Sequence, residues 1–214
     1  MATTTAPLLS FGASGAIAKT QVYATWKGRP YARRYVIPSN PNTAEQQLTR
    51  SVFAWLNNVW KFIPSGAIDA WVLYGRNSRF TDRNGFIKKN LAALREASDL
   101  DDFIFSPSAG GGLAASAVTF TGGALQITIA PTAPTLPTGW TIVRAIGAVI
   151  KDQDPNTGTL YQVKSGEDAT GPYSIVITGL TAATLYQCGA WFEFMKPDGS
   201  LAYGEAFMGN ATTS

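Results

Sequence analysis

The segment 152–158 has the arrangement of oxygen-bearing side chains that comes nearest to a metal site. Asp152 and Asp154 alternate with other residues, as the ligands of a calcium-binding EF-hand loop do. Glycine, however, falls at the seventh position instead of the sixth, and Pro155 stiffens the middle of the segment. Val163 stands at the twelfth position, where such a loop needs a glutamate that binds through both oxygens. We therefore predict a β-turn between two strands here, and no metal site.

The side chains that most enzymes use for acid–base or covalent catalysis are scarce. The chain contains no histidine, which excludes serine–histidine and cysteine–histidine pairs. Its single cysteine, Cys188, can form no internal disulfide and is predicted to be a small buried residue of a strand. The acidic pairs Asp101-Asp102 and Glu167-Asp168 are adjacent residues, which point apart on a regular element. We predict no catalytic residue and no cofactor; an enzyme would need a carboxylate pair brought together by folding.

Basic and aromatic residues between positions 19 and 35 form a pattern typical of a binding surface. This stretch contains five Lys or Arg residues and no acidic residue, and its rings are Tyr23, Trp26, Tyr31 and Tyr35. Such a ribbon could bind nucleic acid through phosphate neutralisation and base stacking, fit an acidic protein surface, or be an ordinary solvated face with its rings turned inward. We favour the protein surface over nucleic acid. The residues expected to contact the partner are Lys27, Arg29, Tyr31, Arg33 and Arg34.

A β-hairpin followed by three helices is predicted for the amino-terminal half. Segments 17–26 and 31–37 are rich in β-branched and aromatic residues, and 27–30 has the composition of a turn. Thr43 and Gln46 have the spacing of a helix capping box. The predicted helices are 43–63, ended by Pro64; 65–75; and 84–94, which opens at Asn84 or Gly85. The side chains expected to face inward include Trp55, Trp60, Ile68, Trp71 and Val72. These elements predict a small α+β domain.

The carboxyl-terminal half is predicted to be an all-β domain. Its alternation of apolar and polar residues is clearest in 125–129 and 186–194. Seven strands with turn signals between them favour an antiparallel sandwich. The predicted strands are 117–120, 124–129, 140–150, 159–164, 173–178, 185–195 and 201–207.

A run of glycine, serine and alanine near residue 107 separates these halves by composition. We expect an anchoring domain of residues 1–106, a linker of residues 107–116 and a β-sandwich of residues 117–214. Up to Phe105 the chain has 13 Lys or Arg and 7 Asp or Glu residues, and after it 4 and 7. The basic half is therefore the one expected to seek an acidic partner.

Composition also bounds the surroundings of the protein. Charged residues make up 14% of the chain and hydrophobic residues 45%, whereas an ordinary soluble domain has about 25% charged residues. This balance indicates either burial against neighbouring proteins or a surface of small residues. There is no apolar run of about 18 residues and no secretory signal pattern at the start. We expect a protein made in the cytoplasm that does not span a membrane.

The segment Leu180-Thr181-Ala182-Ala183-Thr184-Leu185-Tyr186 resembles the corner before the sixth strand of a fibronectin type III domain. The resemblance implies that the hydroxyl of Tyr186 bonds back to the preceding backbone. Ala182 stands in place of the usual proline, and strand 125–129 lacks the tryptophan commonly found there. An immunoglobulin-like sandwich of the same general build is equally open.

The amino-terminal half resembles a group of small proteins encoded by tailed phages and prophages. The resemblance covers about 90 residues and consists of Gly12, Gly15, Trp26-Lys27-Gly28, Tyr31, Arg34, Asn40-Pro41-Asn42-Thr43, Gln46 or Gln47, Arg50, Phe53, Trp71 and the segment 86–90. It implies a structural protein of the virion without enzymatic activity. We expect a capsid decoration or cement protein, present in multiple copies and bound to major capsid or tail proteins. A tail, baseplate or neck protein is the alternative. A carbohydrate-binding or host-adhesion module is the alternative of another class, with Trp140, Trp191 and Tyr203 as stacking platforms if these rings are exposed.

Overall fold

The computed structural model describes residues 2–3, 14–37, 39, 42–76 and 80–214. The chain divides into two compact units, Met1–Asn42 and Thr43–Ser214. This division lies far from the boundary that composition placed near residue 107. The reason is that the three helices share a hydrophobic core with the strands of the second unit. Gly12, Asn40 and Pro41, which belong to the sequence resemblance above, lie outside the described residues.

The first unit contains a four-stranded antiparallel sheet. Its strands lie in the order β1 (Ala2–Thr3), β4 (Arg29–Arg34), β3 (Gln21–Trp26) and β2 (Gly15–Ile17). The predicted strand 17–26 is broken, because Ala18 and Lys19 have φ angles of 49° and 54° and form a turn. The β3–β4 hairpin closes through Lys27 and Gly28, with φ angles of 49° and 77°. Two successive residues with positive φ are what a tight two-residue hairpin turn requires.

Three α-helices open the second unit: α1 (Ala44–Val59), α2 (Ser65–Arg76) and α3 (Asp82–Leu94), with a short 3-10 helix η2 (Trp60–Phe62) after α1. The side chain of Thr43 caps α1 by accepting the amide of Gln46 at 3.4 Å, as predicted. The reciprocal half of the capping box is absent, since the Oε1 atom of Gln46 is buried without a partner. Helix α3 begins before the predicted position because Thr81 caps it.

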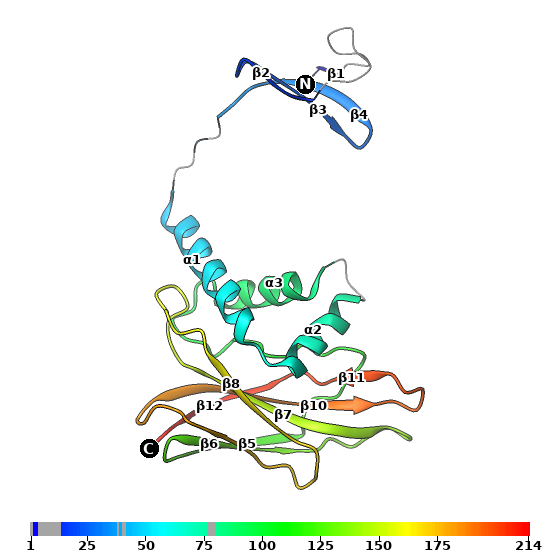
Figure 1. Ribbon diagram of the computed structural model, residues 1–214, viewed down its shortest axis with the longest axis vertical. Coiled ribbons are helices and arrows are strands. Elements are labelled where there is room, and N and C mark those ends of the chain that lie inside the picture. The colour runs from blue at the N-terminus through cyan, green and yellow to red at the C-terminus, as the bar shows by residue number, and fades with distance from the viewer. Residues whose placement is uncertain (1, 4–13, 38, 40–41, 77–79) are drawn as a thin grey trace. The chain divides into compact units, whose positions relative to one another are not determined.

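Two antiparallel sheets make up the rest of this unit. The larger has the order β11 (Leu201–Tyr203), β10 (Leu185–Met195), β7 (Thr141–Lys151) and β8 (Val163–Asp168), and β12 (Phe207–Thr212) also pairs with β10. The smaller has the order β5 (Ala117–Gly123), β6 (Gln126–Thr132) and β9 (Ile175–Thr178). The predicted strand 201–207 is therefore two strands, β11 and the start of β12. Figure 1 shows the helices on one side of the larger sheet and the smaller sheet on the other.

The larger sheet is buried on both faces because β7 and β10 alternate between two cores. Ile146 and Ile150 of β7 and Trp191 of β10 pack in one cluster with the helices. Ala145, Val149 and the predicted face of β10 pack in a second cluster with β6 and β9. That face of β10 consists of Tyr186, Cys188, Ala190, Phe192 and Phe194. Since the helices share a core with the sheet, they belong to its compact unit.

The predicted linker 107–116 is part of this compact unit. Ala109 pairs with Tyr203 through two backbone hydrogen bonds of 2.9 Å. Just before it, Phe105 is buried, and its carbonyl accepts the indole N–H of Trp71 at 2.9 Å. Trp71 thus lies in the core as predicted, whereas Val72, also expected to face inward, is exposed.

The corner before β10 has the hydrogen bond implied by the resemblance to fibronectin type III domains. The hydroxyl of Tyr186 accepts the amide N–H of Thr181 at 2.9 Å, while the ring of Tyr186 is buried. The corner therefore holds the turn after β9 against the start of β10.

Candidate partner interface

The five residues predicted to contact a partner lie on β4 and in the turn before it. Arg29, Tyr31 and Arg33 are alternate residues of β4, and alternate side chains of a strand lie on one face of the sheet. Lys27 lies in the β3–β4 turn. Arg34 directly follows Arg33, so its side chain lies on the opposite face. The predicted set is therefore divided between two faces of one sheet.

Strand pairing shows which residues of β3 share a face with Arg29. In an antiparallel pair, directly opposite residues have their side chains on the same side. Trp26 is opposite Arg29, Ala24 is opposite Tyr31, and Val22 is opposite Arg33. We name this surface the Trp26 face; its members are Val22, Ala24, Trp26, Arg29, Tyr31 and Arg33.

Trp26 is the most prominent apolar group of the Trp26 face. Its side chain is 66% exposed, although sequence reasoning left open that it turns inward. The ammonium of Lys27 lies 4.9 Å from the centroid of the indole ring, within the range of a cation–π contact. The turn therefore presents an aromatic surface and a positive charge side by side.

The opposite surface, which we name the Arg34 face, has a different character. Its members are Gln21, Tyr23, Thr25, Pro30, Ala32 and Arg34. Tyr23 is buried, and its hydroxyl donates a hydrogen bond of 3.0 Å to the side-chain oxygen of Gln21. Its ring is thus already packed and its hydroxyl satisfied, so Tyr23 is an internal residue of the sheet and not a contact residue.

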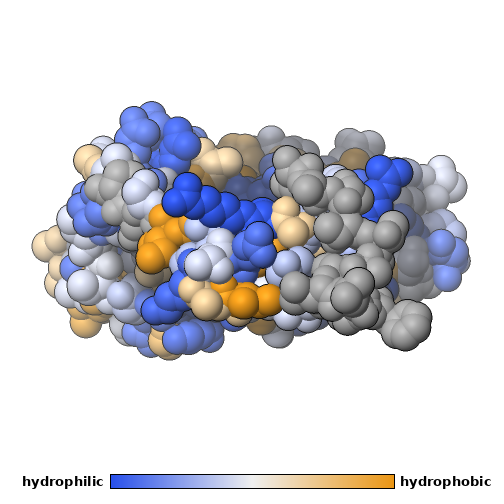
Figure 2. All heavy atoms as spheres, turned by 90° about the horizontal axis from the view of Figure 1, so that it is seen from above, coloured by the Kyte–Doolittle hydropathy of each residue, from blue (hydrophilic) through white to orange (hydrophobic). Residues whose placement is uncertain are grey.

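All formally charged side chains of Met1–Asn42 are positive. The unit contains five Lys or Arg residues and no acidic residue, while the rest of the chain has twelve Lys or Arg and fourteen Asp or Glu residues. Figure 2 colours the whole chain by hydropathy and shows strongly hydrophilic side chains directly beside hydrophobic ones on the face that is seen. A unit with only positive side chains attracts acidic partners, and the attraction weakens as salt concentration rises.

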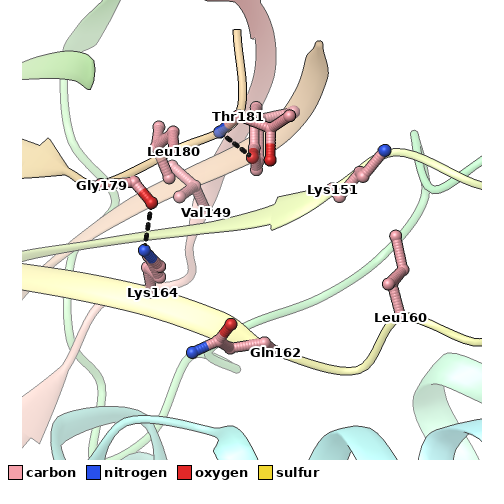
Figure 3. A pocket seen from close by; sticks show the side chains of 9 residues that line it. Val149, Lys151, Leu160, Gln162, Lys164, Gly179, Leu180 and Thr181 are labelled. Atoms are coloured by element: carbon pink, nitrogen blue, oxygen red, sulfur yellow. Dashed lines mark hydrogen bonds between the residues drawn. The ribbon is translucent and has the colours of Figure 1, made fainter. Parts of the chain in front are cut away.

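A pocket of about 140 Å³ lies in the second unit between β7, β8 and the turn after β9. Figure 3 shows Lys164 pointing to the carbonyl of Gly179, to which its ammonium donates a hydrogen bond. Lys151 points away from Lys164 along the other side of the pocket. Because the two ammonium groups do not converge on one point, they do not form a shared binding site for an anion.

A second cleft brings two carboxylates together that sequence reasoning did not connect. Asp69 of α2 and Glu193 of β10 line it with Tyr203 of β11. Burial and the nearby negative charges of Glu193 and Asp69 raise the pKa of the Tyr203 hydroxyl. Both oxygens of Glu193 are engaged, one by Tyr203 at 3.3 Å and one by Arg144 at 2.6 Å. Glu193 is thus held as part of a structural network, and residues 69 and 193 are too far apart in sequence for spacing to have linked them.

The residues proposed as sugar-stacking platforms are mostly inside the protein. Trp191 is fully buried and Tyr203 is 2% exposed, so neither meets the condition of exposure and neither can stack on a ligand. Trp140 is half-buried, packs edge-on against Phe194, and has the ammonium of Lys196 5.4 Å from its ring centroid. Of the three residues, Trp140 alone is partly exposed.

Segment 152–158 forms a turn, as predicted. The backbone carbonyl of Asp154 accepts the amide of Gly158 at 2.7 Å, and its carboxylate accepts the amide of Asn156 at 2.8 Å. The carboxylate of Asp152 accepts the amide of Leu100 at 3.1 Å, which ties the turn to the loop after α3. These carboxylates thus cap backbone groups. Within the described ranges there is no group of three or more acidic or cysteine side chains placed to hold a metal ion.

Cys188 is fully buried in the second core, as predicted, and burial raises the pKa of its thiol to about 12. The thiol therefore stays protonated and unreactive near neutral pH.

In the part of the chain that the structure describes, no helix combines the length and the apolar character needed to cross a membrane. No protein-family model matches the sequence, and no curated protein matches it.

Proposed function

We propose that this chain is a non-enzymatic structural component of a tailed-phage virion, with a capsid decoration or cement role. It attaches to the particle through its amino-terminal sheet, and the second unit adds bulk and contact surface. Many copies arranged on a lattice turn weak individual contacts into stable attachment.

The observation that carries the proposal is the basic amino-terminal sheet. It forms a compact unit separate from the rest of the chain, bears five positive and no negative side chains, and exposes Trp26 beside Lys27. A small, separate, basic element of this kind is suited to attachment, since it can bind a neighbour without disturbing the main fold. The sequence resemblance to phage-encoded proteins lies mainly in this unit and in α1, and supports the same role.

We further infer that the two sheets of the second unit form a sandwich of the fibronectin type III or immunoglobulin kind. The Tyr186 corner and the core shared by β6, β9, β7 and β10 support this finer assignment. In such a sandwich, loops at the two ends are free to contact neighbours, while the helices cover the outer face of the larger sheet.

The proposal is tested by asking whether the full chain is part of purified particles. Particles from the producing cells are separated on a density gradient and analysed by quantitative mass spectrometry. The chain is expected to comigrate with the major capsid protein at a constant ratio across the particle peak. Its absence from that peak would refute the virion role, and comigration with isolated tails would move the role to the tail, baseplate or neck.

A further inference from the structure

The amino-terminal sheet buries very little of itself. Among residues 14–37, 39 and 42, only Tyr23 is buried. A sheet gains its stability by packing one face against another layer, and a small isolated sheet is marginal in water. The one buried side chain among these residues, Tyr23, lies on the Arg34 face, and no residue of the Trp26 face is buried. The Trp26 face is therefore the one that a partner can cover.

The two faces differ in their ability to bind a partner. The Trp26 face carries one tryptophan, one tyrosine and two arginines, the residue types that supply most of the binding energy in protein interfaces. Its tryptophan is 66% exposed, so docking would remove a large apolar surface from water. On the Arg34 face, Tyr23 is already packed and satisfied, which leaves Arg34 as its only charged member.

Charge indicates the chemistry of the partner. The sheets of two copies would bring five positive charges each and would repel each other. The guanidinium groups of Arg29 and Arg33 have the planar geometry that binds carboxylates through two hydrogen bonds. An acidic protein surface matches these groups.

We propose that the Trp26 face is the docking face of this protein, and that its partner is an acidic protein surface with an apolar recess for the indole of Trp26. This inference rests on the proposed function, because it names the partner chemistry of the same attachment site. Arg34, although part of the predicted contact set, lies outside this interface.

Neighbouring arginines on opposite faces provide a charge-matched test in the full chain. Arg33→Glu and Arg34→Glu change the net charge equally and differ only in the face that they alter. Each variant is supplied to cells that assemble the particles without the wild-type chain, and copies per particle are counted by mass spectrometry. We expect R33E to lose about tenfold or more in occupancy, the scale of an interface hot spot, while R34E stays within about twofold of wild type.

Trp26→Ala gives a second measure that does not depend on charge. It is expected to reduce occupancy about as strongly as R33E. Thermal unfolding of each purified full-length variant should show the transition of the second unit unchanged. A variant with that transition intact and low occupancy has lost docking and not the main fold.

The outcomes separate the inference from the proposed function. Absence of the wild-type chain from particles would overturn the virion role itself. If the wild-type chain is present on particles and R33E and R34E lose equal occupancy, only net charge matters and docking through one face is overturned. Normal occupancy of W26A would overturn it as well.

A short DNA duplex added to the purified chain tests the other class of partner. Binding abolished by R33E and kept by R34E would assign the face to nucleic acid and overturn the acidic-protein partner.

Discussion

Arg144 of β7 forms ion pairs with two carboxylates that differ in burial. Its Nε atom lies 2.6 Å from Glu193, whose side chain is 7% exposed, and its Nη1 atom lies 2.6 Å from Glu167, whose side chain is 61% exposed. Since the two distances are equal, the surroundings of each carboxylate decide how much each pair contributes. The two pairs therefore form an internal comparison around one guanidinium.

Replacing Arg144 with methionine keeps most of the stem but leaves the buried carboxylate of Glu193 with Tyr203 as its remaining partner. Breaking a buried ion pair in this way costs about 3–5 kcal/mol. The side chain of Arg144 is 26% exposed, so we expect the lower end, about 3 kcal/mol. For a unit of this size, that corresponds to a fall in Tm of about 6–12 °C. Glu167→Gln removes only the exposed pair and should cost about 0–1 kcal/mol.

The stability of both variants is measured by urea and thermal unfolding of the full chain. The unfolding transition of the second unit is the one that is compared with wild type. The double variant R144M/E193Q should be more stable than R144M alone, because no carboxylate is then left buried without its cation. Equal effects of R144M and E167Q, both below about 1 kcal/mol, would refute the argument from burial. A double variant less stable than R144M would refute the argument that the stranded carboxylate causes the loss.

Three further outcomes follow from single contacts in the second unit. Tyr186→Phe removes the acceptor of the Thr181 amide and should lower the free energy of unfolding in urea by about 1 kcal/mol. Tyr173→Phe is the control and should lower it by less, because the hydroxyl of Tyr173 makes no hydrogen bond within the described residues. Cys188, with a thiol pKa raised to about 12, should resist alkylation at pH 8 in the folded chain and react once urea unfolds it; rapid labelling of the folded chain would contradict its burial. Backbone amides of Ser174 and Thr170 lower the pKa of the Asp168 carboxyl, so its ionised form stabilises the fold above about pH 4 and the stabilisation is lost as pH falls through the lowered pKa. The stability difference between wild type and Asp168→Asn should therefore be present at pH 7 and shrink below about pH 4, and a constant difference would contradict the assignment.

Local signals in the sequence predicted several elements well. Thr43 has a capping side chain and precedes regularly spaced apolar residues, and it does cap α1. Tyr186 forms the corner hydrogen bond because the corner depends on a few neighbouring residues only. The alternation of β10 predicted one of its buried faces, since a strand repeats every two residues.

Long-range packing was not predictable from the same signals. Segment 107–116 has the composition of a linker, but Ala109 pairs with Tyr203, a residue far along the chain. The helices pack on the larger sheet through Ile146, Ile150 and Trp191. In the run 145–150, the side chains that point to one face of the strand and those that point to the other are all apolar, apart from the glycine at 147. A strand of this kind is buried on both faces. The run therefore indicates that a layer covers each face of this sheet.

For the candidate interface, the basic and aromatic composition was visible in the sequence but the face was not assigned. Arg33 and Arg34 are adjacent, so the two-residue period of a strand separates them. The position of Trp26 opposite Arg29 depends on where the hairpin turns, which the register shows. The predicted turn 27–30 was two residues too long, because Arg29 and Pro30 belong to β4. The sequence therefore did not show that Arg29 pairs with Trp26.

The central claim is that this chain is a structural part of a virion attached through its amino-terminal sheet. The most direct measurement is electron microscopy of intact particles labelled with a gold-conjugated antibody that recognises residues 117–214. We predict regular label over the head, and the same preparation from cells that make R33E should lose it. Particles that carry the wild-type chain without any label would contradict an outward second unit, and wild-type particles that lack the chain altogether would contradict the virion role.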